Sequence, residues 1–208
     1  MENNKFRSAF KSRFFISIVG APITIYATFH EHLFSLLVIL LSIFLFYEWL
    51  SRIKSVFDKI FGSLIIIFFI FSIITINNSN NYLTIWLFLI VWISDISGYF
   101  VGKYFGKIKI FKISPNKTLE GYLASVLFSQ CSYFIMKCFN DLNIIINKVI
   151  IVQFLICIAC IIGDLFYSFY KRKYKLKDYS NHLGDHGGFL DRVDGLIFSS
   201  VIFYIINL

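Results

Sequence analysis

Long runs of hydrophobic residues, separated by short polar connections, occupy most of the chain. A helix that crosses the hydrocarbon core of a bilayer needs roughly 20 mostly apolar residues. Segments of this kind are residues 14–29, 33–50, 60–76, 82–100, 119–139, 149–169 and 196–208, the last of them short. The pattern predicts an all-α polytopic membrane protein with about seven transmembrane helices, organised as a single integral-membrane domain over residues 1–208.

The basic residues fall almost entirely in alternate connections between these segments. With the N-terminus in the cytoplasm, every Lys and Arg except Lys137 and Lys148 lies on the cytoplasmic side. Cytoplasmic loops of membrane proteins carry such an excess of Lys and Arg. The charge pattern therefore predicts a cytoplasmic N-terminus and two long cytoplasmic loops, at residues 101–118 and 170–195.

The composition excludes a water-soluble protein. Hydrophobic residues make up 58% of the chain and charged residues 15%, against about 25% charged residues in an average soluble domain. The formal charge of +8 would favour nucleic-acid binding in a soluble protein. Here the placement of the basic residues follows membrane topology, so no nucleic-acid partner is expected.

The cysteines and histidines give little reason to expect a zinc or redox site. Cys157 and Cys160 have the spacing of half such a site, but no second Cys pair or suitably spaced His accompanies them. Both lie in an apolar segment, so we expect this pair to pack inside the protein.

Three carboxylates, Glu48, Asp95 and Asp164, lie within apolar segments or at their cytoplasmic ends. A charged side chain near the bilayer centre costs about 2.5–3.5 kcal/mol on insertion scales, so such groups usually face a cavity or a partner. Glu48 is close to Arg52, and a snorkelling or paired interfacial acid explains it best. Asp95 and Asp164 each lead into a long loop, which favours a functional role.

The second long loop combines acids, bases and glycines in a way that fixing topology does not require. Asp191 and Asp194 are three residues apart and would share one face of a helix, where Asp164 could meet them. Carboxylate oxygens suit Mg²⁺, Lys and Arg suit phosphate, and the backbone at Gly187-Gly188 can approach a ligand closely. The loop therefore predicts a site for Mg²⁺ and phosphate.

The first long loop contains two further signals. Gly98, Gly102 and Gly106 recur every four residues, a spacing that favours close packing of membrane helices. Residues 114–118, Ser-Pro-Asn-Lys-Thr, predict a tight turn whose hydroxyl, N–H and ammonium groups could bind a phosphate, although the spacing is not that of a P-loop.

Together these segments closely resemble the phosphatidate cytidylyltransferases, also called CDP-diglyceride synthases. The signature of that family runs from a Ser through Lys-Arg and Lys-Asp to His-Gly-Gly-x-x-Asp-Arg-x-Asp. The matching residues are Ser168, Lys171, Arg172, Lys177, Asp178, Ser180, Leu183, Gly184, His186, Gly187, Gly188, Asp191, Arg192, Val193 and Asp194. Gly163-Asp164, residues 95–106 and residues 114–121 also resemble the family.

The resemblance implies that CTP and phosphatidate react to give CDP-diacylglycerol and pyrophosphate, a step of phospholipid biosynthesis. Asp164 and Asp191, assisted by Asp194, would hold Mg²⁺, and a second cation could lie nearby. The implied catalytic residues are Ser168, Lys171, Arg172, Lys177, Asp178, His186 and Arg192. The implied residues of the nucleotide site are Asp95, Ser114, Lys117, Thr118 and Glu120.

The resemblance also implies where the protein works. It would lie in the bacterial inner membrane with its active site at the cytoplasmic face, open to CTP from water and to phosphatidate from the bilayer. Families of this kind are often dimeric, which suggests a homodimer, although no residue pattern here indicates one.

Three positions depart from the family pattern: Tyr167 replaces a common Glu, Tyr170 an aliphatic residue and Asp185 a Gly. The chain is also expected to be one or two spans shorter than typical bacterial members. Of these departures, Tyr167 is the first candidate for reduced or altered activity.

Two alternative functions fit parts of the sequence. A CTP-dependent lipid kinase would use the same nucleotide and metal but release CDP, and the signature at residues 186–194 favours the cytidylyltransferase. A small cation transporter would explain the intramembrane carboxylates but not the long basic loops.

Overall fold

The computed structural model describes residues 20–111, 113–115, 117–139, 146–183 and 187–207. Within these residues the protein is all-helical, and the only β-type pairing is an isolated bridge between Lys109 and Thr118. This confirms the predicted all-α class.

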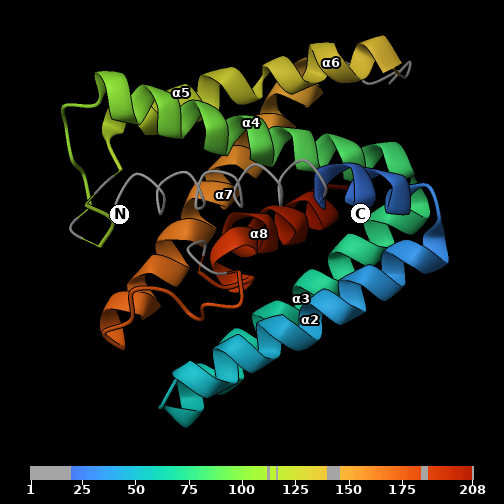
Figure 1. Ribbon diagram of the computed structural model, residues 1–208. Helices are drawn as coiled ribbons and strands as arrows, with labels where there is room; N and C mark the ends of the chain where they lie inside the picture. Colours follow the sequence, from blue (N-terminus) through green and yellow to red (C-terminus); the bar gives the residue numbers. More distant parts are fainter. Residues whose placement is uncertain (1–19, 112, 116, 140–145, 184–186, 208) are drawn as a thin grey trace, which may run out of the picture.

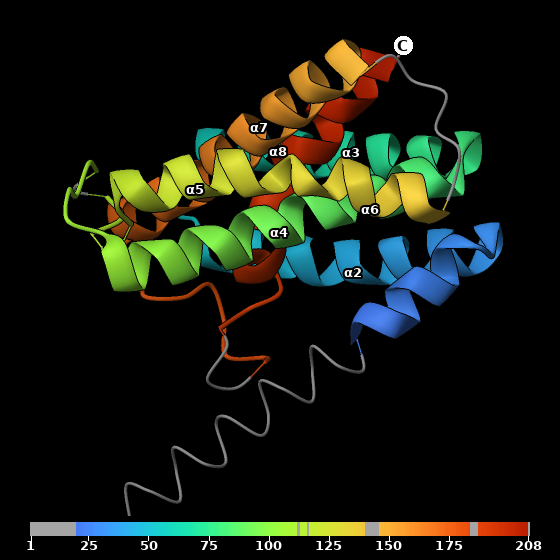
Figure 2. The same cartoon turned by 90° about the horizontal axis from the view of Figure 1, so that it is seen from above.

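The helices form three neighbouring groups (Figures 1 and 2). α2 and α3 are an antiparallel pair, α4 runs beside α5 and α6, and α8 packs against α7, α3 and α4. Residues 20–28 form a short helix that precedes them. The bounds are α2 (Glu31–Arg52), α3 (Val56–Ser79), α4 (Asn81–Phe105), α5 (Leu119–Ser129), α6 (Cys131–Phe139), α7 (Ile146–Lys173) and α8 (Leu190–Asn207).

Four of the described helices are long and apolar enough to cross a membrane: Glu31–Arg52, Val56–Ser79, Asn81–Phe105 and Lys148–Lys173. They coincide with the predicted segments at residues 33–50, 60–76, 82–100 and 149–169. The predicted count of about seven is not reproduced among the described residues.

The remaining predicted spans differ from the structure for separate reasons. Residues 119–139 are not one helix, because the chain breaks at Gln130, whose side chain donates to the carbonyl oxygen of Val126 at 3.3 Å. The last helix begins at Leu190 and includes the charged residues of its first turns, so it is more polar than the predicted segment at 196–208. Of the segment predicted at 14–29, residues 14–19 lie outside the described residues, and residues 20–28 form the short helix that precedes α2.

The two long connections are shorter than predicted because the flanking helices extend into them. α4 continues to Phe105 and α7 to Lys173, which leaves connections at residues 106–118 and 174–189. Thr118 caps α5, since its hydroxyl accepts a hydrogen bond from the N–H of Gly121 at 3.3 Å.

Glycines allow two pairs of helices to approach closely. A Cβ on Gly121 of α5 would lie 2.8 Å from the carbonyl oxygen of Gly98 and 3.3 Å from Cα of Gly102, both on α4. A Cβ on Gly163 of α7 would lie 2.5 Å from the carbonyl oxygen of Asp194 on α8. The contacts confirm that the α4 glycines pack against a neighbouring helix, as predicted. Gly163 allows a similar close approach of α7 to α8.

The cysteine pair packs inside the protein, as predicted. Cys157 and Cys160 are buried free thiols. The sulfur of Cys157 lies 3.3 Å from the hydroxyl of Ser94, and Cys160 fills the space above Gly195 of α8.

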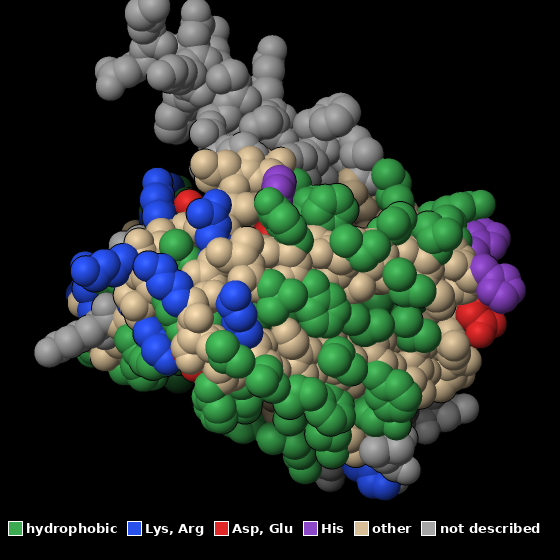
Figure 3. Space-filling view, turned by 90° about the horizontal axis from the view of Figure 1, so that it is seen from below, with side chains coloured by type: hydrophobic (Ala, Val, Ile, Leu, Met, Phe, Trp, Pro, Cys, Tyr) green, Lys and Arg blue, Asp and Glu red, His purple; other side chains and the backbone are tan. Residues whose placement is uncertain are grey.

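Lys and Arg side chains gather at one end of the molecule, while hydrophobic side chains cover much of the surface beyond them (Figure 3). Histidine and acidic side chains mark the opposite end in the same view. Arg52, Lys103 and Lys171 lie in the last turns of α2, α4 and α7, which all end on the basic side. Both long connections therefore belong to the basic end.

Candidate functional site

A cavity of about 620 Å³ lies among α4, α5, α7 and α8 at the basic end. Pockets for small ligands commonly measure about 300–1,000 Å³. Acidic and basic side chains from two parts of the chain, residues 95–117 and residues 164–194, line it: Asp95, Lys103, Lys117, Asp164, Asp191, Arg192 and Asp194. The structure thus brings two segments that are distant in the sequence to one site.

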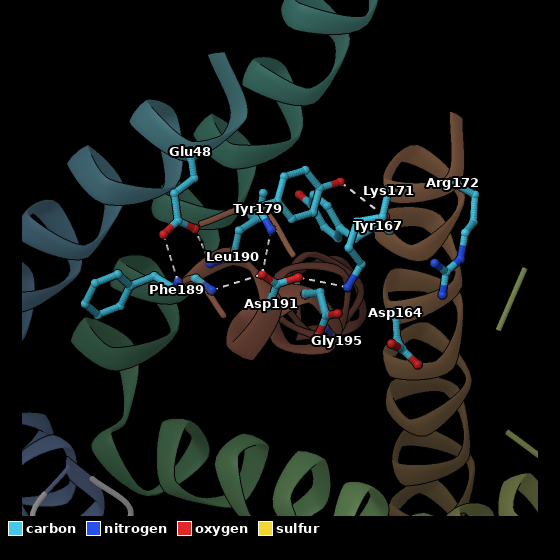
Figure 4. Close-up of polar contacts among 12 residues, drawn as sticks. Glu48, Asp164, Tyr167, Lys171, Arg172, Tyr179, Phe189, Leu190, Asp191 and Gly195 are labelled. Carbon is cyan, nitrogen blue, oxygen red and sulfur yellow. Dashed lines mark hydrogen bonds and ion pairs between the residues drawn. The ribbon is translucent and has the colours of Figure 1, made fainter. Parts of the chain in front are cut away.

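Asp191, in the first turn of α8, is held by three hydrogen-bond donors (Figure 4). Its Oδ1 accepts from Nζ of Lys171 at 2.8 Å. Its Oδ2 accepts from the N–H groups of Tyr179 at 2.9 Å and Gly188 at 3.0 Å. The carboxylate therefore fixes the connection at 174–189 to the beginning of α8, where the helix dipole also favours a negative charge.

Asp164 and Asp95 reach the same cavity from α7 and α4. Asp164 forms an ion pair with Lys117, which comes from the turn at residues 114–118. The thiol of Cys160 is 3.8 Å from Oδ1 of Asp95. Lys117 therefore joins the first connection to the wall that α7 contributes.

The carboxylates suit a hard divalent cation chemically, but they are not assembled into a complete ligand set. The part of the chain that the structure describes contains no group of three or more His, Cys, Asp or Glu placed to hold a metal ion. Asp164, Asp191 and Asp194 nevertheless line one cavity. Mg²⁺ is usually bound by one or two carboxylates together with substrate phosphates, so these residues fit a site that a phosphate substrate completes.

The predicted turn at residues 114–118 is described apart from Asn116. The N–H of Lys117 donates to the carbonyl oxygen of Ser114 at 3.2 Å, which closes the turn. Lys117 and Thr118 then line the cavity, whereas Ser114 does not. The structure thus directs the ammonium and one hydroxyl of this turn to the site.

Arg172 and Glu120 stabilise the first connection from outside the cavity. Nε of Arg172 donates to the carbonyl oxygen of Ile113 at 3.2 Å. Both carboxylate oxygens of Glu120 lie 3.3 Å from the N–H of Ile108. Neither side chain is part of the cavity lining, so in this structure they shape the connection that carries Lys117.

Four other predicted site residues that the structure describes do not line the cavity, and one of them is Lys171, which contacts Asp191. Ser168 is buried in α7, Lys177 is exposed and Asp178 is half-buried in the connection at 174–189. His186 lies outside the described residues, together with its neighbour Asp185.

Glu48 has a role that the sequence did not indicate. It is paired, as predicted, but it is fully buried and does not snorkel. Its carboxylate accepts hydrogen bonds from the N–H groups of Phe189 at 3.0 Å and Leu190 at 2.8 Å, and from the hydroxyl of Ser180 at 2.6 Å. Nδ1 of His182 lies 3.1 Å from the same carboxylate. Glu48 thus anchors α8 and the second connection to α2 (Figure 4).

Comparison with known proteins identifies the family. Residues 7–208 match the model of the cytidylyltransferase family. The chain belongs to this family.

Curated relatives support the same assignment. The chain is 37% identical over 171 residues to phosphatidate cytidylyltransferase of Aquifex aeolicus (strain VF5), covering 80% of this chain and 62% of that protein. It is 34% identical over 185 residues to the protein of the same name from Rickettsia bellii (strain RML369-C), covering 84% and 80%. The match to the one from Staphylococcus haemolyticus (strain JCSC1435) is 37% over 115 residues, covering 55% and 44%. The matched part is thus less than two thirds of the Aquifex and Staphylococcus proteins.

In this member of the cytidylyltransferase family, one face of α4 contributes two cavity-lining residues that the sequence analysis did not predict. Tyr99 and Lys103 follow Asp95 at intervals of four residues, and all three line the cavity. Nζ of Lys103 lies 3.5 Å from the hydroxyl of Tyr99. The four-residue spacing from Asp95 could have predicted both residues, since residues four apart on a helix share a face.

The two described departures from the family pattern lie away from the cavity lining. The ring of Tyr167 is fully buried, with centroids 5.8 Å from Trp49 and 6.1 Å from Tyr179. The hydroxyl of Tyr179 donates to the carbonyl oxygen of Tyr167 at 3.1 Å, and burial raises the pKa of this hydroxyl, which keeps its proton. Tyr170 donates to Oδ1 of Asp58 at 3.4 Å. In this structure both departures serve packing and the attachment of α7.

Proposed function

We propose that the protein transfers the cytidylyl group of CTP to phosphatidate, which gives CDP-diacylglycerol and pyrophosphate. The observation that carries the proposal is one cavity in which carboxylates and basic side chains from residues 95–117 meet those from residues 164–194. Membership of the cytidylyltransferase family and relatives named phosphatidate cytidylyltransferase support it.

The cavity lining offers the charges that this reaction requires. Lys103, Lys117 and Arg192 would bind the triphosphate and stabilise the departing pyrophosphate. An oxygen of the phosphatidate phosphate would attack the α-phosphorus of CTP as the bond to pyrophosphate breaks. Such transfers depend mainly on positioning and charge neutralisation, so a protein nucleophile is not needed.

Asp164, Asp191 and Asp194 would hold Mg²⁺, with room for a second cation, and bound Mg²⁺ would neutralise phosphate charge. Lys171 orients the Asp191 carboxylate through its 2.8 Å contact. Asp95 and Thr118 would complete the nucleotide site, and Ser114 and Glu120 would support it through the shape of the first connection.

The remaining family residues are proposed to act from α7 and the second connection. Ser168 and His186 would position substrate oxygens, and Lys177 would add positive charge near the phosphates. Asp178 and Arg172 would hold the connections in place, Arg172 through the carbonyl of Ile113.

The site would also admit a lipid. Tyr99, Tyr122 and Ile161 add apolar surface to a cavity that is otherwise charged, which suits a molecule with a phosphate head and acyl chains. The basic end would face the cytoplasm of a bacterial inner membrane, where CTP is available and acidic phosphatidate is attracted. A homodimer is part of this proposal.

The proposal is tested with purified protein in mixed micelles that contain phosphatidate, Mg²⁺ and CTP labelled at the α-phosphate. The expected result is label in the lipid fraction, with release of unlabelled pyrophosphate. The Asp164→Asn variant should lose this transfer, because it removes the charge that faces Lys117 and the cavity. Glu31→Gln is the matched control, since it removes an acid in the first turn of α2, at the end opposite the basic loops.

Other outcomes distinguish the alternatives. Label that stays in soluble CDP while the lipid gains an unlabelled phosphate would identify a CTP-dependent lipid kinase. Cation flux into liposomes without CTP turnover would identify a transporter. Equal transfer by the wild type and Asp164→Asn would show that the reaction does not need the carboxylate of Asp164.

A further inference from the structure

A second polar cleft, of about 500 Å³, lies at the end of α2 beside the connection at 174–189. Its lining residues are Tyr47, Ser51, Arg52, Tyr179, Ser180, Asn181 and His182. None of them lines the large cavity, so the two sites are distinct. The cleft is located where a helix long enough to span the membrane ends, which is the level of lipid head groups.

Arg52 is oriented by one firm contact. Its Nε donates to the carbonyl oxygen of Tyr179 at 2.8 Å, which fixes the plane of the guanidinium. Among the described residues its terminal nitrogens have no hydrogen-bond or ion-pair partner. A planar guanidinium with free terminal N–H groups is suited to bidentate binding of a phosphate.

His182 is the second oriented group of the cleft. Its Nδ1 is 3.1 Å from the buried carboxylate of Glu48, so its Nε2 is the ring nitrogen left for another partner. The negative charge of Glu48 does not oppose an anion in the cleft strongly, because Phe189, Leu190 and Ser180 also donate to it. The side chain of His182 is 40% exposed, which leaves the ring accessible.

An exposed apolar stripe on α2 leads to this cleft. Leu36, Leu40, Phe44 and Tyr47 are exposed and follow each other at intervals of three or four residues, so they share one helix face. The next residue on that face is Ser51, which lines the cleft. Polar groups at the head-group level are therefore continuous with a surface for acyl chains.

We propose that this cleft binds the phosphate of an anionic glycerophospholipid, whose acyl chains lie along the stripe on α2. Arg52 holds the phosphate through its terminal nitrogens, and His182, Ser51 and Asn181 supply further polar contacts. The bound lipid contacts the connection that carries Tyr179, whose N–H binds Asp191 in the large cavity. The proposal concerns binding alone and does not depend on the proposed reaction.

The test measures retention of phosphatidylglycerol by native mass spectrometry of the full chain in detergent, without CTP. This lipid carries the proposed phosphate but is not the proposed substrate, so failure here is separate from failure of the transferase assignment. The wild type should retain it in preference to zwitterionic phosphatidylcholine. Arg52→Gln should weaken retention about tenfold, the effect of losing one charge-assisted contact.

Two further variants control this result. Ser51→Trp fills the cleft without changing charge and should reduce retention as well. Lys54→Gln removes an exposed positive charge two residues beyond Arg52 and outside the cleft, and it should retain the lipid. The native mass spectrum and thermal unfolding of each variant report whether it is folded.

Three outcomes would overturn the proposal. Equal retention by the wild type, Arg52→Gln and Ser51→Trp would show that the lipid binds elsewhere. An equal loss in Lys54→Gln and Arg52→Gln would show that general surface charge attracts it. Displacement of the lipid by inorganic phosphate at the same concentration would assign the cleft to a water-soluble anion.

Discussion

Asp191 has a structural role in addition to the chemical role proposed for it. It lines the large cavity, yet it also binds Lys171 and two backbone N–H groups of the second connection. Loss of activity on its substitution would therefore be ambiguous unless stability is measured as well.

We expect Asp191→Asn to abolish most cytidylyl transfer, by at least about a hundredfold, since electrostatic groups at reacting phosphates have effects of this size. Asn also loses the ion pair with Lys171, so thermal unfolding should occur at a lower temperature. The rate is measured per folded molecule with α-labelled CTP.

Asp58→Asn is the matched control for that experiment. Asp58 is also a buried carboxylate paired with a lysine, Lys173 at 2.5 Å, but it lies outside the cavity. It should lose stability while keeping most of its turnover. If both variants lose turnover in proportion to stability, Asp191 acts only as a structural residue.

Glu48 gives a second prediction at this scale. Glu48→Ala leaves the N–H groups of Phe189 and Leu190 without their acceptor, at about 1–3 kcal/mol for each buried group. Thermal unfolding should show a large loss of stability, and the exposed control Glu31→Gln should show almost none. A stable Glu48→Ala protein would mean that α8 does not need this anchor.

At the scale of elements, glycines determine how closely the helices around the cavity approach. Gly121 faces the backbone of α4, and Gly163 faces the backbone of α8. Backbone atoms cannot move aside as a flexible side chain can, so an added methyl group must separate the helices.

Gly121→Ala should therefore lower stability by about 1–3 kcal/mol, the usual effect of overpacking. It should also weaken CTP binding, because Asp95 reaches the cavity from α4, and Lys117 and Thr118 reach it from the connection that leads directly into α5. Gly20→Ala is the control, since a Cβ there meets nothing within 4 Å. Binding and unfolding that match the control would contradict the close contact of α4 with α5.

At the scale of the whole molecule, charge separates the two ends of the helix bundle (Figure 3). The connection after Arg52 lies at the basic end, whereas Asn80 joins α3 to α4 at the other. Because loops rich in Lys and Arg remain in the cytoplasm, the basic end should face inward.

Single cysteines test this orientation in a background in which the four native cysteines are replaced by Ser. Lys54→Cys should react with an impermeant maleimide only in inside-out vesicles, and Asn80→Cys only in right-side-out vesicles. The opposite pattern would place the site on the outer face and conflict with a supply of CTP from the cytoplasm.

Sequence patterns were enough to predict the helical class, the four helices long and apolar enough to cross a membrane, and several charged residues that line the large cavity. These features depend on local patterns: hydrophobic length, the alternation of basic loops, and motif spacing along one chain. Because these patterns are local, the bounds predicted for some helices were wrong. The break at Gln130 and the extensions of α4 and α7 depend on side-chain bonding and packing that hydropathy does not register.

Which residues meet depends on how the helices pack. Glu48 binds Leu190 across 142 positions of sequence, and Lys117 pairs with Asp164 between two separate segments. Such contacts arise when helices pack, and one sequence contains no periodic signal for them. The sequence pointed to acids and bases suited to a phosphate site, which stays a prediction, while the close approach of α4 to α5 and of α7 to α8 placed several of them around one cavity.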